Sequence, residues 1–411
     1  MDPNTMRRID FWVGVPLCFV LTIGYWLWRL LGLARSGEPA RPKRVVFIQL
    51  AEMGTMVVAY PAIRKIRELF PDATVHVLCF EQIRSSVEIL DTIDPNHIIT
   101  IDSRSAVSLV RDTIRWLWTA RRRGIDTVIN LEAFVRYSSL LTFLSGARTR
   151  VGFHRFNQEG LYTGDLLTHK VLYNAYVHAG HTFLDLVHAL EAPDAEIPRV
   201  KRPLAGDQLT IPKLVTDAAA AQRVWSLLSA RNPHVGPSHK LVVMNPNASK
   251  RFPMRRLPLD AYADLATRLL ADPEVVLLIT GVAEEGADAR YICERVGSPR
   301  ALDLTGATTL TDLLHLFNLA QVLITNDSGP AHFACLTNAH VVVFFGPELP
   351  DRYRPLSDRC DVIYGGYSCS PCVSPYNQRL TPCNNNLCLQ SISIERVARL
   401  VSARLVSLAH A

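Results

Sequence analysis

The sequence predicts a two-domain α/β protein in which each half is built on a doubly wound parallel sheet. Short β-branched runs such as "RVVFIQL" and "ATVHVLCF" alternate with helical runs, which is the pattern of βαβ units. The alternation breaks between residues 200 and 240, where Pro, Gly and charged residues gather, and then resumes. A chain of 411 residues is also too long for one compact core.

The expected strands and helices follow one another in order along both halves. In the first half, strands are predicted at 44–50, 73–80, 97–102 and 126–131, with helices around 63–70 and 112–124. In the second half, strands are predicted at 240–246, 274–281, 301–306, 321–327 and 340–347, with helices at 259–270, 310–320 and 394–410. Ligands of such folds bind at the carboxyl ends of the strands, here expected in a cleft between two lobes.

Five segments follow from this pattern. We expect an N-terminal anchor and tether over residues 1–40, a Rossmann-like domain over 41–215, a linker over 216–240, a second Rossmann-like domain over 241–390, and a C-terminal helix over 391–411 that packs back toward the first domain.

The N-terminus is apolar enough to meet a membrane. Residues 11–28 contain 18 residues without a charge, and the apolar character continues to residue 34, which is enough for a hydrocarbon core of ~30 Å. More Arg and Lys follow the run than precede it, so the catalytic body is expected at the cytoplasmic face of the inner membrane. Gly14 and Pro16 leave a second geometry open, a broken helix that returns to the same leaflet. A cleaved signal peptide is a third, although no small-residue cleavage site follows the run.

Charge and cysteine usage limit the partners. A net charge of +6 without a concentrated basic arm suits anionic ligands or a lipid surface, and no nucleic-acid partner is expected. Nine cysteines are too sparse for a disulfide scaffold. Four of them, Cys369, Cys372, Cys383 and Cys388, have the loop spacing of a structural zinc site. We expect no bound metal, with a site on these four thiols as the alternative.

The segment "ITNDSGPAH" has the pattern of an anion-binding turn. A predicted strand ends at Asp327, and a helix begins a few residues later, so the N–H groups of Ser328 and Gly329 point into the turn. His332 on the first helical turn is able to donate to a phosphate or a leaving oxygen. The alternative is that Asp327 and Ser328 only cap the helix.

Several motifs in this order resemble glycosyltransferase family 9, the group of the ADP-heptose:lipopolysaccharide heptosyltransferases. They are "MGTMVVAYPAIRKIRELFPDATV", "NPNASKRFPMRRLPLDAYADLA", "DSGPAHFACLTNAHVVVFFGP" and "CSPC". The resemblance implies a GT-B fold and an inverting mechanism without a catalytic metal or other cofactor. It also implies that the C-terminal lobe holds the nucleotide-diphosphate sugar, ADP-heptose in the family, and that the N-terminal lobe holds a lipopolysaccharide-type or lipid-linked acceptor.

The resemblance assigns donor-site residues in the second half. Asp327, Ser328, Gly329 and His332 match the family's diphosphate turn. Arg255 or Arg256 occupies the position of the basic residue that neutralises the departing diphosphate, with Lys250 as a helper. Glu284 is the candidate for the ribose, and Glu285 competes for that role.

In the first half, the resemblance raises a question about the base. The family places an Asp directly after the Gly of a "SxxGD"-like turn, but this chain has Gly54-Thr55. Thr55 is not a general base at neutral pH, so Glu52, in the same turn, is the expected base. Gly54 and Thr55 are expected to border the donor. A simpler alternative gives Glu52 only a favourable charge at a helix N-terminus.

Two further readings remain open in the first half. Glu132 and Arg136 follow a predicted strand and are candidate acceptor contacts, and Glu132 is also a candidate base. The alternative is that Glu132 caps the next helix and that Arg136 is a surface charge.

Two other functions are open. If no residue replaces the missing Asp, the protein is a catalytically silent binding subunit of a polysaccharide assembly. A nucleotide-sugar epimerase on the same architecture is the rival enzyme.

Overall fold

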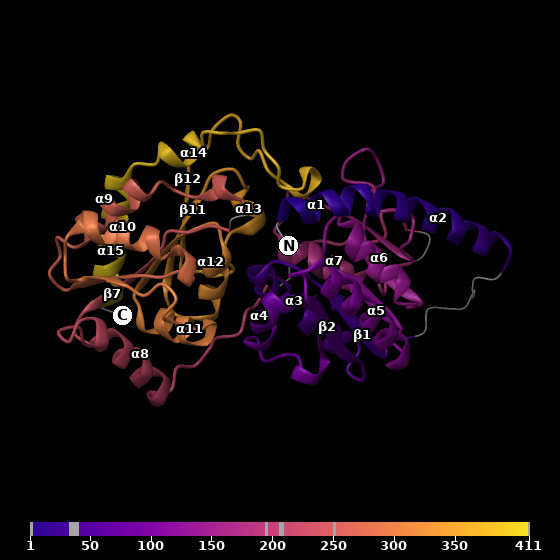
Figure 1. Cartoon of the computed structure of the whole chain (residues 1–411), viewed down its shortest axis with the longest axis horizontal. Coiled ribbons are helices and arrows are strands. Elements are labelled where there is room, and N and C mark those ends of the chain that lie inside the picture. Colours follow the sequence, from indigo (N-terminus) through magenta and orange to yellow (C-terminus); the bar gives the residue numbers. More distant parts are fainter. Residues whose placement is uncertain (1–2, 33–40, 194–195, 205–208, 250–251, 410–411) are drawn as a thin grey trace. The chain divides into compact units, whose positions relative to one another are not determined.

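The protein is described by a computed structural model that covers residues 3–32, 41–193, 196–204, 209–249 and 252–409. It divides into two compact units (Figure 1). The first comprises Met1–Leu209 with Pro375–Gln378, and the second Thr210–Ser374 with Arg379–Ala411. Each unit has its own six-stranded parallel sheet, so the predicted fold class is confirmed.

The first unit reverses its strand order at β1. Its strands are β1 (Arg44–Ile48), β2 (Thr74–Phe80), β3 (Ile98–Ile101), β4 (Thr127–Asn130), β5 (Thr149–His154) and β6 (His169–Leu172), in the spatial order β3-β2-β1-β4-β5-β6. Strand β1 pairs with β2 on one side and β4 on the other, with Ile48 opposite both Leu78 and Asn130. The carboxyl ends of β1 and β4 therefore form the topological switch point, where ligands of such sheets bind.

Helices cover both faces of the first sheet. Helix α3 (Met53–Leu69) packs on α7 (Ala179–His188), and the short α4 (Arg84–Glu88) follows the 3-10 turn η1 (Glu81–Ile83). Helices α5 (Ala106–Arg122) and α6 (Arg136–Leu144) share one core cluster, which joins Trp116 and Leu141 to Val46 and Ile48 of β1. A 3-10 turn, η2 (Pro95–His97), leads into β3.

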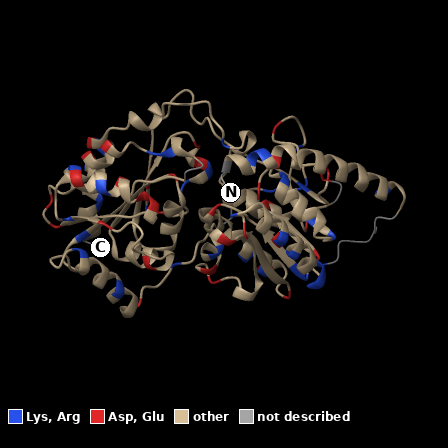
Figure 2. Cartoon of the chain, in the orientation of Figure 1, with Lys and Arg blue, Asp and Glu red and all other residues tan. Residues whose placement is uncertain are grey.

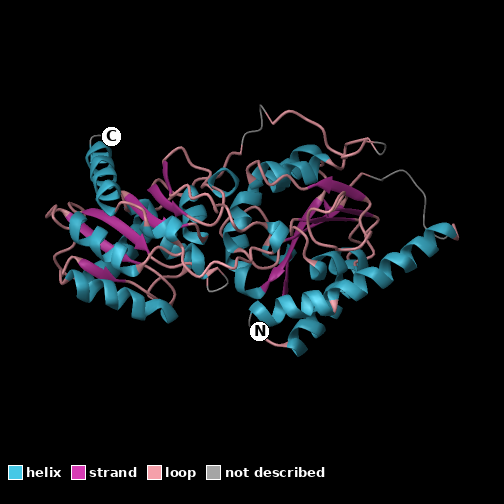
Figure 3. Cartoon of the chain, turned by 90° about the horizontal axis from the view of Figure 1, so that it is seen from above, coloured by secondary structure: helices cyan, strands magenta, loops and turns pink. Residues whose placement is uncertain are grey.

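The apolar N-terminus forms two helices that belong to the first unit. Helices α1 (Pro3–Trp12) and α2 (Gly14–Leu30) pack on α6 and run along one side of the unit (Figure 3). In the described part of the chain, the stretch Asn4–Leu30 is the one helical run whose length and composition would suffice to cross a membrane. Most of the expected tether, residues 33–40, lies outside the described residues.

The second unit repeats the doubly wound plan. Its strands are β7 (Lys240–Asn245), β8 (Val275–Ile279), β9 (Ala301–Asp303), β10 (Val322–Asn326), β11 (His340–Phe345) and β12 (Cys360–Tyr364), in the order β12-β11-β10-β7-β8-β9. Here the switch point lies between the carboxyl ends of β7 and β10. Strands β5, β6 and β12 were not among those predicted.

The helices of the second unit correct two predictions, which are the extent of the linker and the packing partner of the C-terminal helix. They are α8 (Ala218–Arg231), α9 (Leu259–Leu269), α10 (Gly286–Val296), α11 (Leu310–Leu319), α12 (Gly329–Phe333), α13 (Pro350–Tyr353), α14 (Leu387–Gln390) and α15 (Ile394–Ala409). The expected linker 216–240 contains α8, which packs on α11 through a buried face. The C-terminal helix α15 packs on α9, within the second unit, because Val397, Val401 and Leu405 join the core cluster of that unit.

Candidate active site

A buried asparagine joins the two strands that border the switch point of the second unit. The side chain of Asn326, at the end of β10, accepts a hydrogen bond from the Leu257 N–H at 2.9 Å. Its amide donates to the carbonyls of Pro246 and Asn247 at 3.0 and 3.1 Å. Asn326 thus ties the segment after β7 to the turn after β10 and sets the backbone of the predicted diphosphate turn.

The structure does not support the alternative in which the Ser328 side chain caps the helix after this turn. Ser328 is the N-cap residue of α12, and its side chain makes no capping hydrogen bond in the described part of the chain. The Ser328 hydroxyl donates instead to the Asn326 carbonyl at 3.2 Å, while the Asp327 carboxylate lies 3.4 Å from the Arg255 guanidinium. A helix of five residues has a small dipole, so an anion here relies on local N–H groups and nearby cations. His332 is buried on the same helix.

Arg255 is the centre of a buried charged cluster. Its guanidinium lies 2.8 Å from the Glu348 carboxylate and stacks over the Phe252 ring at 4.8 Å. Arg379 approaches the same carboxylate at 3.7 Å, and the buried Arg352 acts on it through its charge. Three guanidinium groups stand against the carboxylates of Asp327 and Glu348, which leaves an excess of positive charge. A buried cation excess beside an open turn suits a diphosphate.

Burial shifts the titration of both carboxyl groups in this cluster. Desolvation raises the pKa of Glu348 from 4.5 to about 7, against the opposing charge of Arg255. Desolvation likewise raises the pKa of Asp327, again opposed by Arg255. Burial alone would lower the pKa of Arg255, but the two carboxylates more than offset this and raise it. Arg255 therefore stays charged, and Glu348 changes its charge near neutral pH.

The structure distinguishes Arg255 from Arg256 and Glu284 from Glu285, the two pairs of alternative candidates. Arg256 pairs with Asp288 of α10 at 2.7 Å, so Arg255 rather than Arg256 lies beside Asp327. After β8, the Glu285 carboxylate accepts the Val282 N–H at 3.0 Å, while Glu284 is exposed. Of the two acids, Glu284 is thus the one turned to solvent. Lys250 lies outside the described residues.

The first unit brings Glu52 and Thr55 together at its own switch point. Glu52 is the N-cap residue of α3, directly after β1, and the Thr55 hydroxyl donates to its carboxylate at 3.0 Å. Gly54 is buried in the first turn of the helix. Thr55 therefore orients the carboxylate of Glu52, a positioning role that the sequence did not suggest.

Glu132, the second acid at this switch point, is used by the backbone. One of its carboxylate oxygens accepts the Leu50 N–H at 2.7 Å and the Gln49 amide at 3.1 Å. These two hydrogen bonds use one of the two oxygens of the Glu132 carboxylate. Glu132 thus holds the end of β1 in place, and Glu52 stays the predicted base.

Comparison with known protein families identifies the class of this protein. Residues 115–380, more than half of the chain, match the family described as "Glycosyltransferase family 9 (heptosyltransferase)". The chain belongs to glycosyltransferase family 9. The match includes Arg255, Asp327 and Glu348, whereas Glu52 lies before it.

Individual family 9 proteins are similar over different lengths. Lipooligosaccharide heptosyltransferase 2 of Haemophilus influenzae is 30% identical over 113 residues, 27% of this chain and 33% of the relative, so the chain matches about a third of that relative's length. The structure of Escherichia coli ADP-heptose lps heptosyltransferase II has a TM-score of 0.68 at 18% identity, covering 89% of this chain and 99% of that one. E. coli heptosyltransferase WaaC with ADP has a TM-score of 0.59 at 14% identity, covering 88% and 99%. At such identities the structures show the fold, which is the expected GT-B fold.

Arg136 has a different place in this family 9 chain from the one predicted. Its side chain is 3% exposed, pairs with Asp10 of α1 at 3.2 Å and donates to the Tyr162 carbonyl at 3.0 Å. It is neither a surface charge nor, in this arrangement, free for an acceptor. Neither predicted role anticipated this ion pair, because the partner of Arg136, Asp10, comes from the apolar N-terminus, 126 residues away.

Among the described residues, no disulfide joins the four clustered cysteines. Cys369 is exposed and Cys388 is buried, and the Cys383 thiol donates to the Asn385 carbonyl at 3.2 Å. Burial raises the pKa of Cys388, with a smaller contribution from the other three cysteines. Among the residues that the structure describes, no group of three or more His, Cys, Asp or Glu is arranged to hold a metal ion.

Glu348 and Arg379 are the site residues that sequence reasoning missed. Glu348 follows the "FFGP" end of a predicted strand, where ligands of parallel sheets bind, so its position was a usable signal. Arg379 carried no such signal, because it lies in a long loop and reaches the site only through the fold.

The raised pKa of Glu348 predicts how stability depends on pH. Between pH 4.5 and about 7 the folded protein keeps a proton on Glu348 that the unfolded chain has lost. This stabilising contribution is complete below pH 4.5 and disappears as the pH rises through 7. We expect the Tm of Glu348→Gln to decline less steeply between pH 5 and pH 8 than the Tm of the wild type. Parallel curves for the two proteins would contradict a buried, titrating Glu348.

Proposed function

We propose that this family 9 protein is an inverting, metal-independent glycosyltransferase that moves a sugar from a nucleoside diphosphate to an acceptor hydroxyl. The observation that carries the proposal is the buried arginine cluster around Arg255 beside the uncapped turn at Ser328. Such a cluster neutralises a departing diphosphate without a metal. Relatives named as heptosyltransferases, one of them with ADP, favour ADP-heptose as the donor.

The proposed reaction is a direct displacement. The acceptor oxygen attacks the anomeric carbon, and the bond from that carbon to the diphosphate oxygen breaks on the opposite face. The hydroxyl proton passes to the Glu52 carboxylate, and the bonding electron pair leaves with the nucleoside diphosphate. Arg255 and the N–H groups of Ser328 and Gly329 stabilise the charge that develops on the leaving oxygen. The product has the inverted anomeric configuration.

The acceptor we propose is a lipopolysaccharide-type or lipid-linked glycan at the cytoplasmic face of the inner membrane. The names of the relatives support a lipopolysaccharide-type acceptor. The apolar N-terminal segment supports a location at the membrane, since it keeps the enzyme near a lipid-anchored substrate.

Release of nucleoside diphosphate tests this function. Full-length protein in lipid nanodiscs is given ADP-heptose with and without heptose-free lipopolysaccharide, and free ADP is measured. We expect ADP to appear together with heptosylated acceptor, and only when acceptor is present. Conversion of the donor without acceptor would instead indicate an epimerase.

A silent binding subunit is the second candidate, because Thr55 stands where the family places its catalytic Asp. It predicts that ADP-heptose raises the Tm while no ADP is released with any acceptor.

A further inference from the structure

The apolar N-terminal helices are fastened to the first unit by polar contacts along their length. Asp10 pairs with the buried Arg136 at 3.2 Å and accepts the Tyr137 N–H at 2.9 Å. One helix further on, the Thr22 hydroxyl accepts the Asp165 N–H at 2.9 Å, and the Trp26 indole donates to the Asp165 carboxylate at 3.0 Å. From residue 10 to residue 26 the helices extend for about 24 Å at 1.5 Å per residue. They are thus held at both ends of this length.

The packing between these helices and the body is also close. A Cβ atom on Gly14 would lie 2.7 Å from the Cβ atom of Arg136. On the opposite side of the contact, a Cβ atom on Gly164 would lie 2.8 Å from the Thr22 hydroxyl and 3.0 Å from the Cys18 carbonyl. The backbones therefore meet where only glycine fits. A helix crossing a bilayer would have to break these contacts or draw the Asp10 and Asp165 carboxylates into hydrocarbon.

The same helices also expose many apolar side chains. Figure 2 shows α2 almost entirely in the colour of uncharged residues. The exposed large apolar side chains of this segment, which we name the N-terminal stripe, are Ile9, Phe11, Trp12, Val13, Leu17, Phe19, Val20, Ile23, Trp26, Leu27, Trp28, Leu30 and Leu31.

Helix α5 carries a second exposed apolar stripe. Val107, Val110, Ile114 and Trp118 follow one another at the spacing of a single helix face and are 58 to 80% exposed. Arginines stand beside them, and the Arg122 guanidinium lies over the Trp118 ring at 4.8 Å. This combination of aliphatic, Trp and Arg side chains is typical of helices that lie on anionic lipid.

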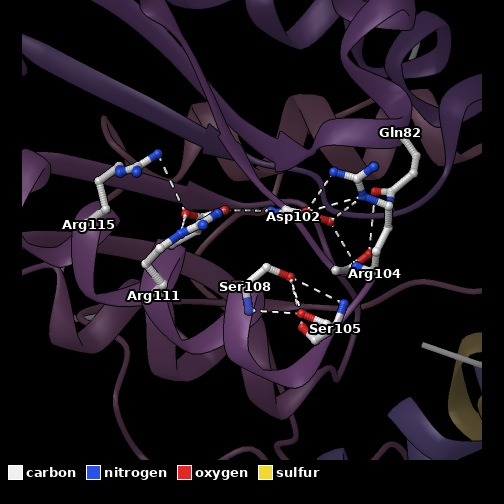
Figure 4. A network of polar contacts seen from close by, with 9 residues as sticks. Gln82, Asp102, Arg104, Ser105, Ser108, Arg111 and Arg115 are labelled. Carbon is white, nitrogen blue, oxygen red and sulfur yellow. Dashed lines mark hydrogen bonds and ion pairs between the residues drawn. The ribbon is translucent and has the colours of Figure 1, made fainter.

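A polar network fixes the rotation of α5, so that the stripe stays outside. Ser105 and Ser108 form a capping box at the start of the helix (Figure 4). The buried Asp112 carboxylate accepts the Asp102 N–H at 3.0 Å and pairs with Arg111 at 2.8 Å. With Asp112 facing inward, the opposite face of the helix is turned to solvent.

The two stripes are carried by neighbouring helices on one face of the sheet. Helix α6 contacts α1, α2 and α5. Met6 of α1 packs on the same core cluster as Leu109 and Leu117 of α5. The stripes are therefore carried by one helical layer of the first unit.

We propose that this layer is a monotopic docking face, which binds the surface of an anionic bilayer through both stripes while the N-terminal helices lie in the membrane plane and do not span it. The inference deepens the membrane association in the proposed function. The lipid partner is favoured over a protein because the stripes mix apolar side chains with arginines, which meet acyl chains and lipid phosphates together. Trp12, Trp28 and Trp118 supply the side chains that favour the interface.

Labelling of the N-terminus distinguishes a monotopic from a spanning arrangement. Asn4→Cys is expressed in the full chain, and spheroplasts are treated with a membrane-impermeant maleimide. We expect no label at residue 4 until the membrane is permeabilised, like the exposed native Cys369 of the second unit, which serves as the internal control. Labelling of residue 4, but not of Cys369, in intact spheroplasts would overturn the proposal.

Vesicle binding tests the contribution of α5. Full-length Ile114→Glu and the matched control Val406→Glu, an exposed aliphatic residue on α15 of the second unit, are partitioned onto phosphatidylglycerol-containing vesicles and onto neutral vesicles. We expect Ile114→Glu to reduce binding to the anionic vesicles by about tenfold and the control to leave it unchanged. Equal binding of both variants, or an α5 effect only on association with another protein, would overturn the lipid assignment. No sugar donor is present, so failure of glycosyl transfer does not affect this result.

Discussion

Glu52→Gln is expected to lower turnover by about a hundredfold or more, because an amide is unable to take the proton of the acceptor hydroxyl. The carboxylate follows β1 at the switch point and is oriented by the Thr55 hydroxyl at 3.0 Å. Nucleotide binding should be nearly unchanged, since the proposed diphosphate turn belongs to the second unit. The measurements are the rate of acceptor-dependent ADP release and the Tm shift with ADP.

Two matched variants make this result specific. Glu132→Gln removes the neighbouring acid, whose carboxylate holds the Leu50 N–H, and is expected to lower the Tm more than the turnover of the folded enzyme. Glu68→Gln, at an exposed position on the same helix as Thr55, should change neither. A turnover that falls only with Glu132→Gln would transfer the role of base to Glu132.

Arg255→Met is expected to destabilise the protein by roughly 3–5 kcal/mol, because it leaves two buried carboxyl groups without their shared cation. The guanidinium lies 3.4 Å from Asp327 and 2.8 Å from Glu348. The same change should abolish the Tm shift produced by ADP, since it removes the cation beside the proposed diphosphate turn. Denaturant unfolding and ADP-dependent melting measure the two effects.

The destabilisation caused by Arg255→Met is expected to depend on pH. Without Arg255, the pKa values of Asp327 and Glu348, already raised by burial, rise further, so the folded variant holds protons that the unfolded chain releases. Its stability therefore falls as the pH rises, and the deficit against wild type is expected to be smaller at pH 5 than at pH 8. Arg256→Met, which breaks a half-exposed pair with Asp288, should cost no more than about 1 kcal/mol. An equal loss of unfolding free energy in Arg255→Met and Arg256→Met would contradict a buried charged cluster centred on Arg255.

Much of the fold was predictable because its signals are local. The β-branched runs that became β1, β2, β7, β8, β10 and β11 are buried on both faces, so each reads as a continuous apolar stretch. The boundary errors have a physical cause as well. Helix α8 follows a Pro- and Gly-rich stretch, and only its buried contact with α11 makes it part of the second unit.

The candidate site was predictable where it follows a strand and was missed where it depends on distant pairing. Asp327, Ser328 and Glu52 all stand at the carboxyl ends of central strands, a position that the sequence pattern reveals. The pairing of Arg255 with Glu348 joins residues 93 positions apart. No local pattern distinguishes Arg255 from Arg256, and the choice between them depends on which side chain is buried.

By itself, the sequence determined the order of βαβ units, the small-residue turn after Asn326, the Gly54-Thr55 pair and the apolar character of residues 11–34, because each is a property of neighbouring residues. Only the tertiary structure decided how charges are used. It placed Arg136 under the N-terminal helices as the partner of Asp10, and it assigned Glu132 to the backbone of β1. Such ion pairs and hydrogen bonds form only where folding brings distant residues within contact distance. Their strength depends on how far water is excluded around them.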